Sequence, residues 1–306
     1  MKQDLTRRQF LGTAGATILC SSLSPKLHAE PMTNPIAVFS KVYQELKLNF
    51  EQSAEVTAEA GLDGIDCSVR PGGEILPERA ADDMPLYAEA LAKHKVRMLL
   101  LTTGILEVKS PNAEKILRTA KKLGIKYYRI GYWQHKPETP KNVLVDNVKA
   151  QLKDLSAMNR EIGVCALFQN HAAGKNKAKP YAGGDLNEMY DIMKDLDPQN
   201  MGVAFDLGHA IRTHGDEWPS HFEKLKSHIK IAYIKDVKRD EGFVPFGQGE
   251  FGGTDFFSRL KKMNYNEPFS MHIEFEWAEK GKPKTREALV NTLSESRQML
   301  RKWMTA

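Results

Sequence analysis

Residues 201–209 read MGVAFDLGH, and this stretch decides the fold. An apolar run leads into Asp206, and His209 follows three residues later. A short apolar run between turn residues predicts a strand that is buried on both faces. A carboxylate at the end of such a strand lies at the carboxyl edge of the sheet, where α/β proteins place their ligand sites. The stretch therefore predicts a buried parallel strand that carries Asp206 to a functional edge.

Three further segments share this design. They are VCALFQNH at residues 164–171, IKIAYIKD at residues 229–236 and FSMHIEFE at residues 269–276. Each is an apolar run that ends in side chains able to bind a metal ion, donate a hydrogen bond or move a proton. Four independent strand ends of one type predict a single convergent site.

Strand-like and helix-like patterns alternate along the chain and are joined by short turns. The eight predicted strands span residues 36–40, 64–68, 97–102, 127–130, 164–169, 202–206, 229–235 and 269–274. The chain has 306 residues and shows no linker or low-complexity tract, which suits one barrel-sized domain. Eight strand–helix pairs favour a single (β/α)₈ TIM barrel over an open doubly wound sheet. In such a barrel every carboxyl strand end faces the same mouth.

Residues 1–29 have the pattern of an export signal of the twin-arginine type. Paired arginines stand in TRRQFL at residues 6–11, an apolar stretch follows, and LHA at residues 27–29 precedes the expected cleavage site. We expect the twin-arginine export machinery to deliver the mature domain, residues 30–306, to the periplasm or another exported location. The apolar stretch is too short and too rich in Gly, Ser and Thr for stable membrane insertion. Cys20 lacks the small preceding residue of a lipoprotein site, so a lipid anchor is the weaker alternative.

The net charge argues against a polyanionic partner. The formal net charge is +5, and residues 1–29 contribute +3 of it, because they hold four basic residues and one acidic residue. The mature chain therefore carries about +2, which is no basis for binding a nucleic acid.

Two cysteines remain in the mature chain, Cys67 and Cys165, and both fall in predicted buried strands. Buried thiols are usually inert, although an oxidising compartment would permit a disulfide between them.

The candidate catalytic residues are Glu274, Lys235 and His209. Glu274 lies two residues from both His272 and Glu276, so the three side chains are expected on one face of the predicted strand. A buried carboxylate there needs a partner, which a metal ion, a substrate hydroxyl or simply Lys235 would supply.

The candidate substrate-binding residues come mainly from loops after strands. They are Arg70, Glu74, Arg129, Trp133, His171 and Tyr233. Aromatic rings beside arginines and carboxylates suit the faces and hydroxyls of a sugar, and they equally suit the packing of a loop.

Short motifs at these positions resemble the xylose isomerase-like TIM-barrel superfamily of sugar phosphate isomerases and epimerases, which includes inosose dehydratases and endonuclease IV. The matching residues are Gln169-Asn170-His171, Phe205-Asp206-x-x-His209, Ile234-Lys235-Asp236, Phe246-Gly247-Gln248-Gly249 and Ile273-Glu274. The resemblance covers the whole mature chain and implies a sugar-converting activity.

The resemblance also implies a divalent ion, Mn²⁺, Mg²⁺ or Zn²⁺, held by Glu, Asp, His and Glu from the fifth to the eighth strand. The corresponding residues here are Gln169, Asp206, Tyr233 and Glu274, so two of the four positions depart from the pattern. Gln169 offers an oxygen without charge, and a tyrosine is a poor ligand unless it is deprotonated. The expected metal ligands are therefore Gln169, Asp206 and Glu274, with a weak site unless His209 or His171 joins them.

Two functions stay open at this point. The first is an exported enzyme that abstracts a proton next to the carbonyl of a sugar or polyol, with Glu274 as the base and Lys235 stabilising the enediolate. The product would be an isomer or epimer, or an eliminated sugar if His209 or Tyr233 acts as an acid in a lyase or dehydratase. The second function is a sugar-binding barrel without catalysis. A phosphodiesterase like endonuclease IV needs more histidines and a basic face, so the sequence disfavours it. The sequence leaves the sugar and the oligomeric state open.

Overall fold

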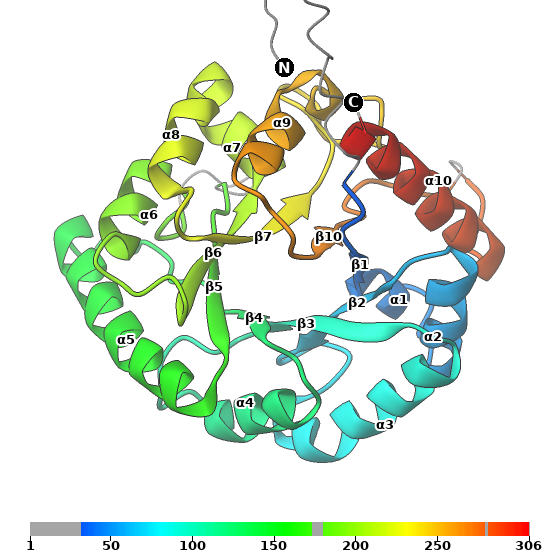
Figure 1. The fold of residues 1–306 in the computed structure, drawn as a ribbon, viewed down its shortest axis with the longest axis horizontal. Helices are drawn as coiled ribbons and strands as arrows, with labels where there is room; N and C mark the ends of the chain where they lie inside the picture. The colour runs from blue at the N-terminus through cyan, green and yellow to red at the C-terminus, as the bar shows by residue number, and fades with distance from the viewer. Residues whose placement is uncertain (1–31, 173–179, 279–280, 306) are drawn as a thin grey trace, which may run out of the picture. The chain divides into compact units, whose positions relative to one another are not determined.

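The computed structural model describes residues 32–172, 180–278 and 281–305. The predicted export signal at residues 1–29 lies outside the described residues. Eight parallel strands form a closed barrel in the order β1-β10-β7-β6-β5-β4-β3-β2, and helices surround it (Figure 1). The prediction of a single (β/α)₈ barrel is confirmed.

The barrel strands agree with the predicted ones to within a few residues at each end. They are β1 Ile36–Phe39, β2 Gly64–Val69, β3 Arg97–Thr103, β4 Tyr127–Arg129, β5 Cys165–Gln169, β6 Met201–Asp206, β7 Ile229–Ile234 and β10 Phe269–Met271. The barrel closes where β1 pairs in parallel with β10, in the register Ile36 to Phe269.

The outer layer consists of helices that bury their apolar faces against the barrel. They are α1 Lys41–Gln44, α2 Phe50–Glu59, α3 Ala80–Lys93, α4 Ala113–Lys122, α5 Lys141–Ile162, α6 Leu186–Met193, α7 Leu207–His214, α8 Trp218–Leu225, α9 Phe256–Lys262 and α10 Arg286–Thr305. Local signals set their ends: a capping box of Asn49 and Gln52 begins α2, and Gly163, with φ of 81°, ends α5. In the described part of the chain, no helix is long and apolar enough to cross a membrane.

Three features differ from the predicted element pattern. Helix α7 begins directly at the end of β6, because Asp206 caps it. A small hairpin of β8 (Val237–Lys238) and β9 (Gly242–Phe243) follows β7. Strand β10 ends at Met271, so Glu274 lies in the loop beyond it. Glu276 leaves the expected face and pairs with Lys284 at 3.1 Å on the surface.

Side chains alternate between the helix layer and the barrel lumen along each strand. In β2, Ile65 and Cys67 pack in the helix layer. Cys165 on β5 packs in the lumen among Leu100, Leu167 and Ile231. Both cysteines are buried free thiols that belong to separate parts of the core. Buried polar side chains at lumen-facing positions, such as Thr102, Gln169 and Asp206, lie at or near the carboxyl ends of their strands, and they place the site.

Candidate functional site

A cavity of about 170 Å³ opens at the carboxyl ends of the barrel strands. Its lining is Phe39, Lys41, Arg70, Arg129, Tyr132, Gln169, His171, Lys235, His272 and Glu274. The strand ends that the sequence singled out do converge here, since β5, β7 and the segment after β10 all contribute. We call this space the mouth cavity.

Lys235 is the centre of the site. Its Nζ lies 3.1 Å from Asp206 Oδ2 and 3.3 Å from Glu274 Oε1, and it donates to His209 Nε2 at 3.0 Å. The residue is 1% exposed. Burial lowers the pKa of Lys235, but the two carboxylates outweigh burial and raise the pKa above its usual value. An ammonium ion therefore stands between the two acids that the sequence paired.

Asp206 lies beneath the cavity and is held rigidly. Its Oδ1 accepts the backbone N–H of His209 at 3.1 Å, which caps α7, and its Oδ2 accepts the Gln169 amide at 2.8 Å. The Asn170 side chain bonds both the backbone N–H and the carbonyl of Asp206, at 2.7 and 2.9 Å. Capping and ion pairing thus act together, because one carboxylate serves the helix and the ammonium.

Glu274 is the carboxylate that the cavity exposes. Its side chain keeps 27% of its exposure, and its Oε1 lies 3.3 Å from Lys235 Nζ and 3.7 Å from His272 Nδ1. Burial raises the pKa of Glu274, but Lys235 and then His272 outweigh burial and hold the pKa well below 4.5. Glu274 is therefore an ionised group with room for a substrate beside it.

His209 and His171 are neutral side chains whose rings contact each other at a tilt of 37°, with centroids 4.0 Å apart. His209 Nε2 accepts from Lys235, so its proton sits on Nδ1, which has no partner. Burial, followed by the charge of Lys235, holds the pKa of His209 well below 6.5 and lowers that of His171 to about 4. His171 lines the mouth cavity, whereas His209 lies behind Lys235 and does not.

His272 is a buried imidazole between two acids. Within the described residues neither ring nitrogen has a hydrogen-bond partner, although Nδ1 lies 3.7 Å from Glu274 Oε1 and Nε2 lies 3.9 Å from Asp66 Oδ2. Its ring stacks on Phe39 and leans on Tyr233, at centroid distances of 4.8 and 4.4 Å. These contacts aim an unsatisfied donor and acceptor at the mouth cavity.

Asp66 is a lumen carboxylate that the sequence reasoning missed. It is fully buried and accepts the hydroxyls of Thr102 and Ser270, each at 2.8 Å. The signal was present in GIDCS, because Asp66 and Ser68 alternate with the apolar Ile65 and Cys67. A polar residue at every second position of a barrel strand indicates a polar lumen there.

Three predicted substrate contacts, Trp133, Glu74 and Tyr233, do not line the mouth cavity. Trp133 packs edge-on against Phe168 and donates to Gln151 Oε1 at 2.7 Å, away from the mouth. Glu74 lines a separate cavity of about 390 Å³ beside the start of α2, where Tyr87 donates to it at 3.2 Å. Burial raises the pKa of Glu74 to about 7. Tyr233 lies below the mouth cavity, with its buried hydroxyl unpartnered.

The motifs around Asp236 and Gly247 form one structural unit. The Asp236 carboxylate accepts backbone N–H groups from Gly247, Gly249 and Phe251 at 2.8, 2.9 and 3.1 Å. A Cβ at Gly249 would overlap Asp236 Oδ1, so only glycine fits there. This anchor fixes the chain that follows Lys235 and so helps to hold the ammonium in place.

The donor set of the mouth fits an ammonium and does not fit a divalent ion. Gln169 donates its amide N–H to Asp206 and accepts the Tyr132 hydroxyl on its oxygen, so that oxygen is engaged away from Asp206. The Lys235 ammonium stands between the other two expected ligands, Asp206 and Glu274. A metal ion would enter only if Lys235 withdrew.

One set of metal-type side chains does converge elsewhere among the described residues. Glu51 and Glu55 on α2 and His94 after α3 bring ligand atoms within 4.8 Å of one another, on the outer helix layer. His94 and Glu51 already pair at 2.8 Å. This cluster lies apart from the mouth cavity and shares no residue with it.

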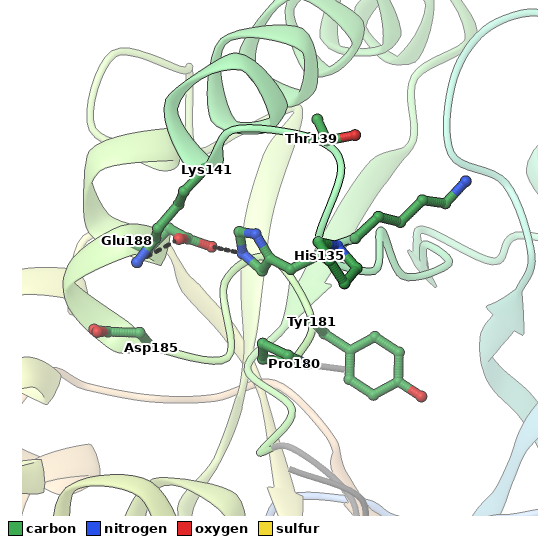
Figure 2. Close-up of a pocket in the computed structure, with 9 residues that line it drawn as sticks. His135, Thr139, Lys141, Pro180, Tyr181, Asp185 and Glu188 are labelled. Atoms are coloured by element: carbon green, nitrogen blue, oxygen red, sulfur yellow. Dashed lines mark hydrogen bonds and ion pairs between the residues drawn. The ribbon is translucent and has the colours of Figure 1, made fainter. Parts of the chain in front are cut away.

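A second cavity, of about 380 Å³, lies between the start of α5 and α6 (Figure 2). Glu188 faces His135 and Lys141 there, at 3.1 and 2.9 Å. The Glu188 carboxylate is therefore already paired within the protein. The mouth cavity, by contrast, gathers unsatisfied polar groups, and it is the candidate active site.

Comparison with known proteins supports the barrel fold and identifies the family. A family model described as xylose isomerase-like TIM barrel matches residues 54–302. An uncharacterized protein of Methanocaldococcus jannaschii is 23% identical over 128 residues, which are 40% of this chain and 41% of that protein.

Two solved structures share the fold. D-allulose 3-epimerase from Methylomonas sp., in complex with D-allulose, has a TM-score of 0.64 at 13% identity, over 89% of this chain and 98% of its own. The IOLI protein with a zinc atom has a TM-score of 0.66 at 20% identity, over 88% of this chain and 99% of its own. The second of these holds a metal ion.

Proposed function

This chain belongs to the xylose isomerase-like TIM barrel family, and we propose that it converts a sugar or polyol by taking a proton from the carbon next to a carbonyl. The observation that carries the proposal is the mouth cavity, where an ionised, partly exposed Glu274 lies beside the Lys235 ammonium. The bound sugar of an epimerase with the same fold supports the substrate class.

Glu274 is the proposed base, and Lys235 the group that stabilises the product of proton transfer. When Glu274 takes the proton it loses its charge, and the negative charge moves to the substrate oxygen. The ammonium, which Glu274 shared with Asp206, is then free to donate to that oxygen. A preorganised cation at the place where charge develops is an effective way to lower the barrier.

His272 is the proposed acid that returns or relays the proton. It is the one imidazole of the lining that lies within 4 Å of both Glu274 and a second carboxylate, Asp66, and both of its nitrogens are unpartnered. We therefore propose His272 as the acid, in place of His209 or Tyr233, which the sequence suggested. His209 bonds Lys235 and does not line the cavity.

A second candidate reaction is elimination, as in a keto-sugar lyase. Gln169 stands where the family pattern has a carboxylate, and an amide cannot act as a second base. One carboxylate with one imidazole is enough for isomerisation or elimination. Export of the chain, which the pattern of residues 1–29 suggests, would favour a free or oxidised sugar over a phosphorylated one.

Incubation with a panel of keto-sugars in D₂O tests the proposal. We expect deuterium at the carbon next to the carbonyl in recovered substrate or product, and a loss of roughly 10²- to 10⁴-fold in the exchange rate for Glu274→Gln. The matched control is Glu276→Gln, two residues away on the surface, which should exchange at the normal rate. Sugar binding without exchange would leave a binding barrel instead, and equal exchange in both variants would exclude Glu274 as the base.

A further inference from the structure

Two guanidinium groups face the mouth cavity without a carboxylate partner. Arg70 follows β2, Arg129 is the last residue of β4, and both line the cavity. Among residues 32–172, 180–278 and 281–305, neither has a carboxylate oxygen within 4.0 Å. Arg129 lies over the Tyr132 ring at 4.6 Å and donates to the Ile130 carbonyl at 2.8 Å, and Arg70 lies over the Phe39 ring at 5.6 Å.

The burial of guanidinium groups without a carboxylate partner lowers the stability of the folded protein. Arg129 is 3% exposed, and a guanidinium cannot shed its charge at physiological pH. Burial, followed by the proximity of Arg129, lowers the pKa of Arg70. Buried charges are normally paired, so two neighbouring cations without a carboxylate indicate that a ligand supplies the anion.

The nearby carboxylates are engaged with other partners. Asp66 accepts the hydroxyls of Thr102 and Ser270, and Glu274 lies on Lys235. The cations of the cavity lining are Lys41, Arg70, Arg129 and Lys235, whereas Glu274 is the acid of that lining. A negatively charged group of the ligand could therefore pair with Arg70 and Arg129 on their side of the mouth.

We infer that the substrate carries a carboxylate, which Arg70 and Arg129 bind, and that the protein acts on an acidic sugar. The planar fork of a guanidinium matches a carboxylate in a bidentate arrangement. In the barrel order, β4 lies opposite β10 and β2 lies opposite β6. A sugar acid anchored at Arg129 would therefore span the mouth and present its other carbons to Glu274, beyond β10.

The inference rests on the proposed function for the place of the reacting carbon, but binding alone tests it. The Glu274→Gln variant cannot complete the proposed reaction, so it is titrated by calorimetry with matched probes. These are hexuronates and aldonates, their neutral counterparts such as D-glucose for D-glucuronate, and the corresponding phosphate esters. We expect at least one acid to bind about tenfold or more tightly than its neutral counterpart.

Substitutions then locate the anion site. Arg70→Gln and Arg129→Leu, in the same background, should each reduce the preference for the acid by about tenfold or more, and Arg70→Lys should restore only part of it. Arg118→Gln is the control, because Arg118 pairs with Glu114 and Glu161 on the outer helices. Circular dichroism confirms folding, and Arg70→Gln carries the test if the buried Arg129 variant unfolds.

The outcomes separate the two proposals. A preference for acids without any deuterium exchange by the wild type would sustain this inference and remove the proposed reaction. No preference for any acid over its neutral counterpart, a preference that survives both arginine substitutions, or tighter binding of the phosphate esters would overturn the carboxylate site.

Discussion

The two sides of the mouth cavity handle charge in opposite ways. On the side of β6, β7 and β10, the Lys235 ammonium is matched by Asp206 and Glu274 at 3.1 and 3.3 Å. On the side of β2 and β4, Arg70 and Arg129 have aromatic neighbours, and no carboxylate oxygen of the described residues lies within 4.0 Å of either guanidinium. The charges on the first side are paired within the protein, whereas we infer that a ligand supplies the anion for the second. The difference suggests that chemistry is built into one side and recognition into the other.

The largest expected effect on stability follows from removing the Lys235 ammonium. Lys235→Met leaves the fully buried Asp206 without its cation, and removal of one partner of a buried pair costs about 3–5 kcal/mol. Urea denaturation of the variant should show a loss of that size in the free energy of unfolding. Activity should fall with it, because Lys235 is also the proposed stabiliser of the enediolate.

Two matched variants sharpen this prediction. Asp206→Asn combined with Lys235→Met should recover much of the loss, since the amide carries no charge. Arg129→Met, on the unpaired side, should cost less than about 1 kcal/mol, because it strands no carboxylate. If Lys235→Met and Arg129→Met had equal effects on stability, the contrast between the two sides would be wrong.

An intermediate effect, on the exchange rate, is expected at His272, which lies between Asp66 on one side of the mouth and Glu274 on the other. In His272→Phe the ring contacts with Phe39 and Tyr233 persist, while two unpartnered buried nitrogens are removed. The exchange rate should therefore fall about 10- to 100-fold, while the free energy of unfolding stays equal or rises. Kinetics and urea denaturation of the same preparation check both parts. A variant with normal exchange would rule out His272 as the acid.

The smallest effect on activity is expected at Glu74, outside the mouth. Its pKa is about 7 in the folded chain and near 4.5 in the unfolded chain, because burial penalises its charge. Between these values the folded chain retains a proton that the unfolded chain releases, so Glu74 lowers stability as the pH rises through this window. Glu74→Gln should match the wild type in free energy of unfolding near pH 4 and exceed it by about 3 kcal/mol near pH 8.

Activity shows whether Glu74 binds substrate or is a buried residue outside the site. Because it lines the cavity beside α2, Glu74→Gln should leave deuterium exchange unchanged at pH 7. A large loss of exchange would return Glu74 to the substrate-binding residues that the sequence suggested.

Periodic features of the sequence predicted the barrel well. Apolar runs with a terminal acid, such as the one that ends at Asp206, identify buried strands, and the barrel then brings their ends together. The last strand was predicted too long, because FSMHIEFE continues its alternation after the pairing ends at Met271. Pairing with a neighbour, which a single sequence does not display, decides where a strand stops.

The site was predictable where side chains lie at strand ends and less so in loops. Lys235 was found because its position follows from strand direction, and Glu274 because the alternation of FSMHIEFE continues into the loop after β10. Glu74 and Trp133 lie in loops, where no period relates sequence spacing to side-chain direction. Sequence spacing did not show that Lys235 lies between Asp206 and Glu274, because contacts among side chains from three strand ends depend on their distances in space.

Titration with Mn²⁺ tests most directly whether the cation of this site is the Lys235 ammonium. Calorimetry should compare the wild type with Lys235→Ala, both carrying Glu51→Gln and Glu55→Gln so that the outer cluster is removed. We expect no Mn²⁺ binding with Lys235 present, and binding in Lys235→Ala that a further Asp206→Asn abolishes. Binding by the protein that retains Lys235, lost on Asp206→Asn, would contradict the assignment and place a metal ion between the two acids.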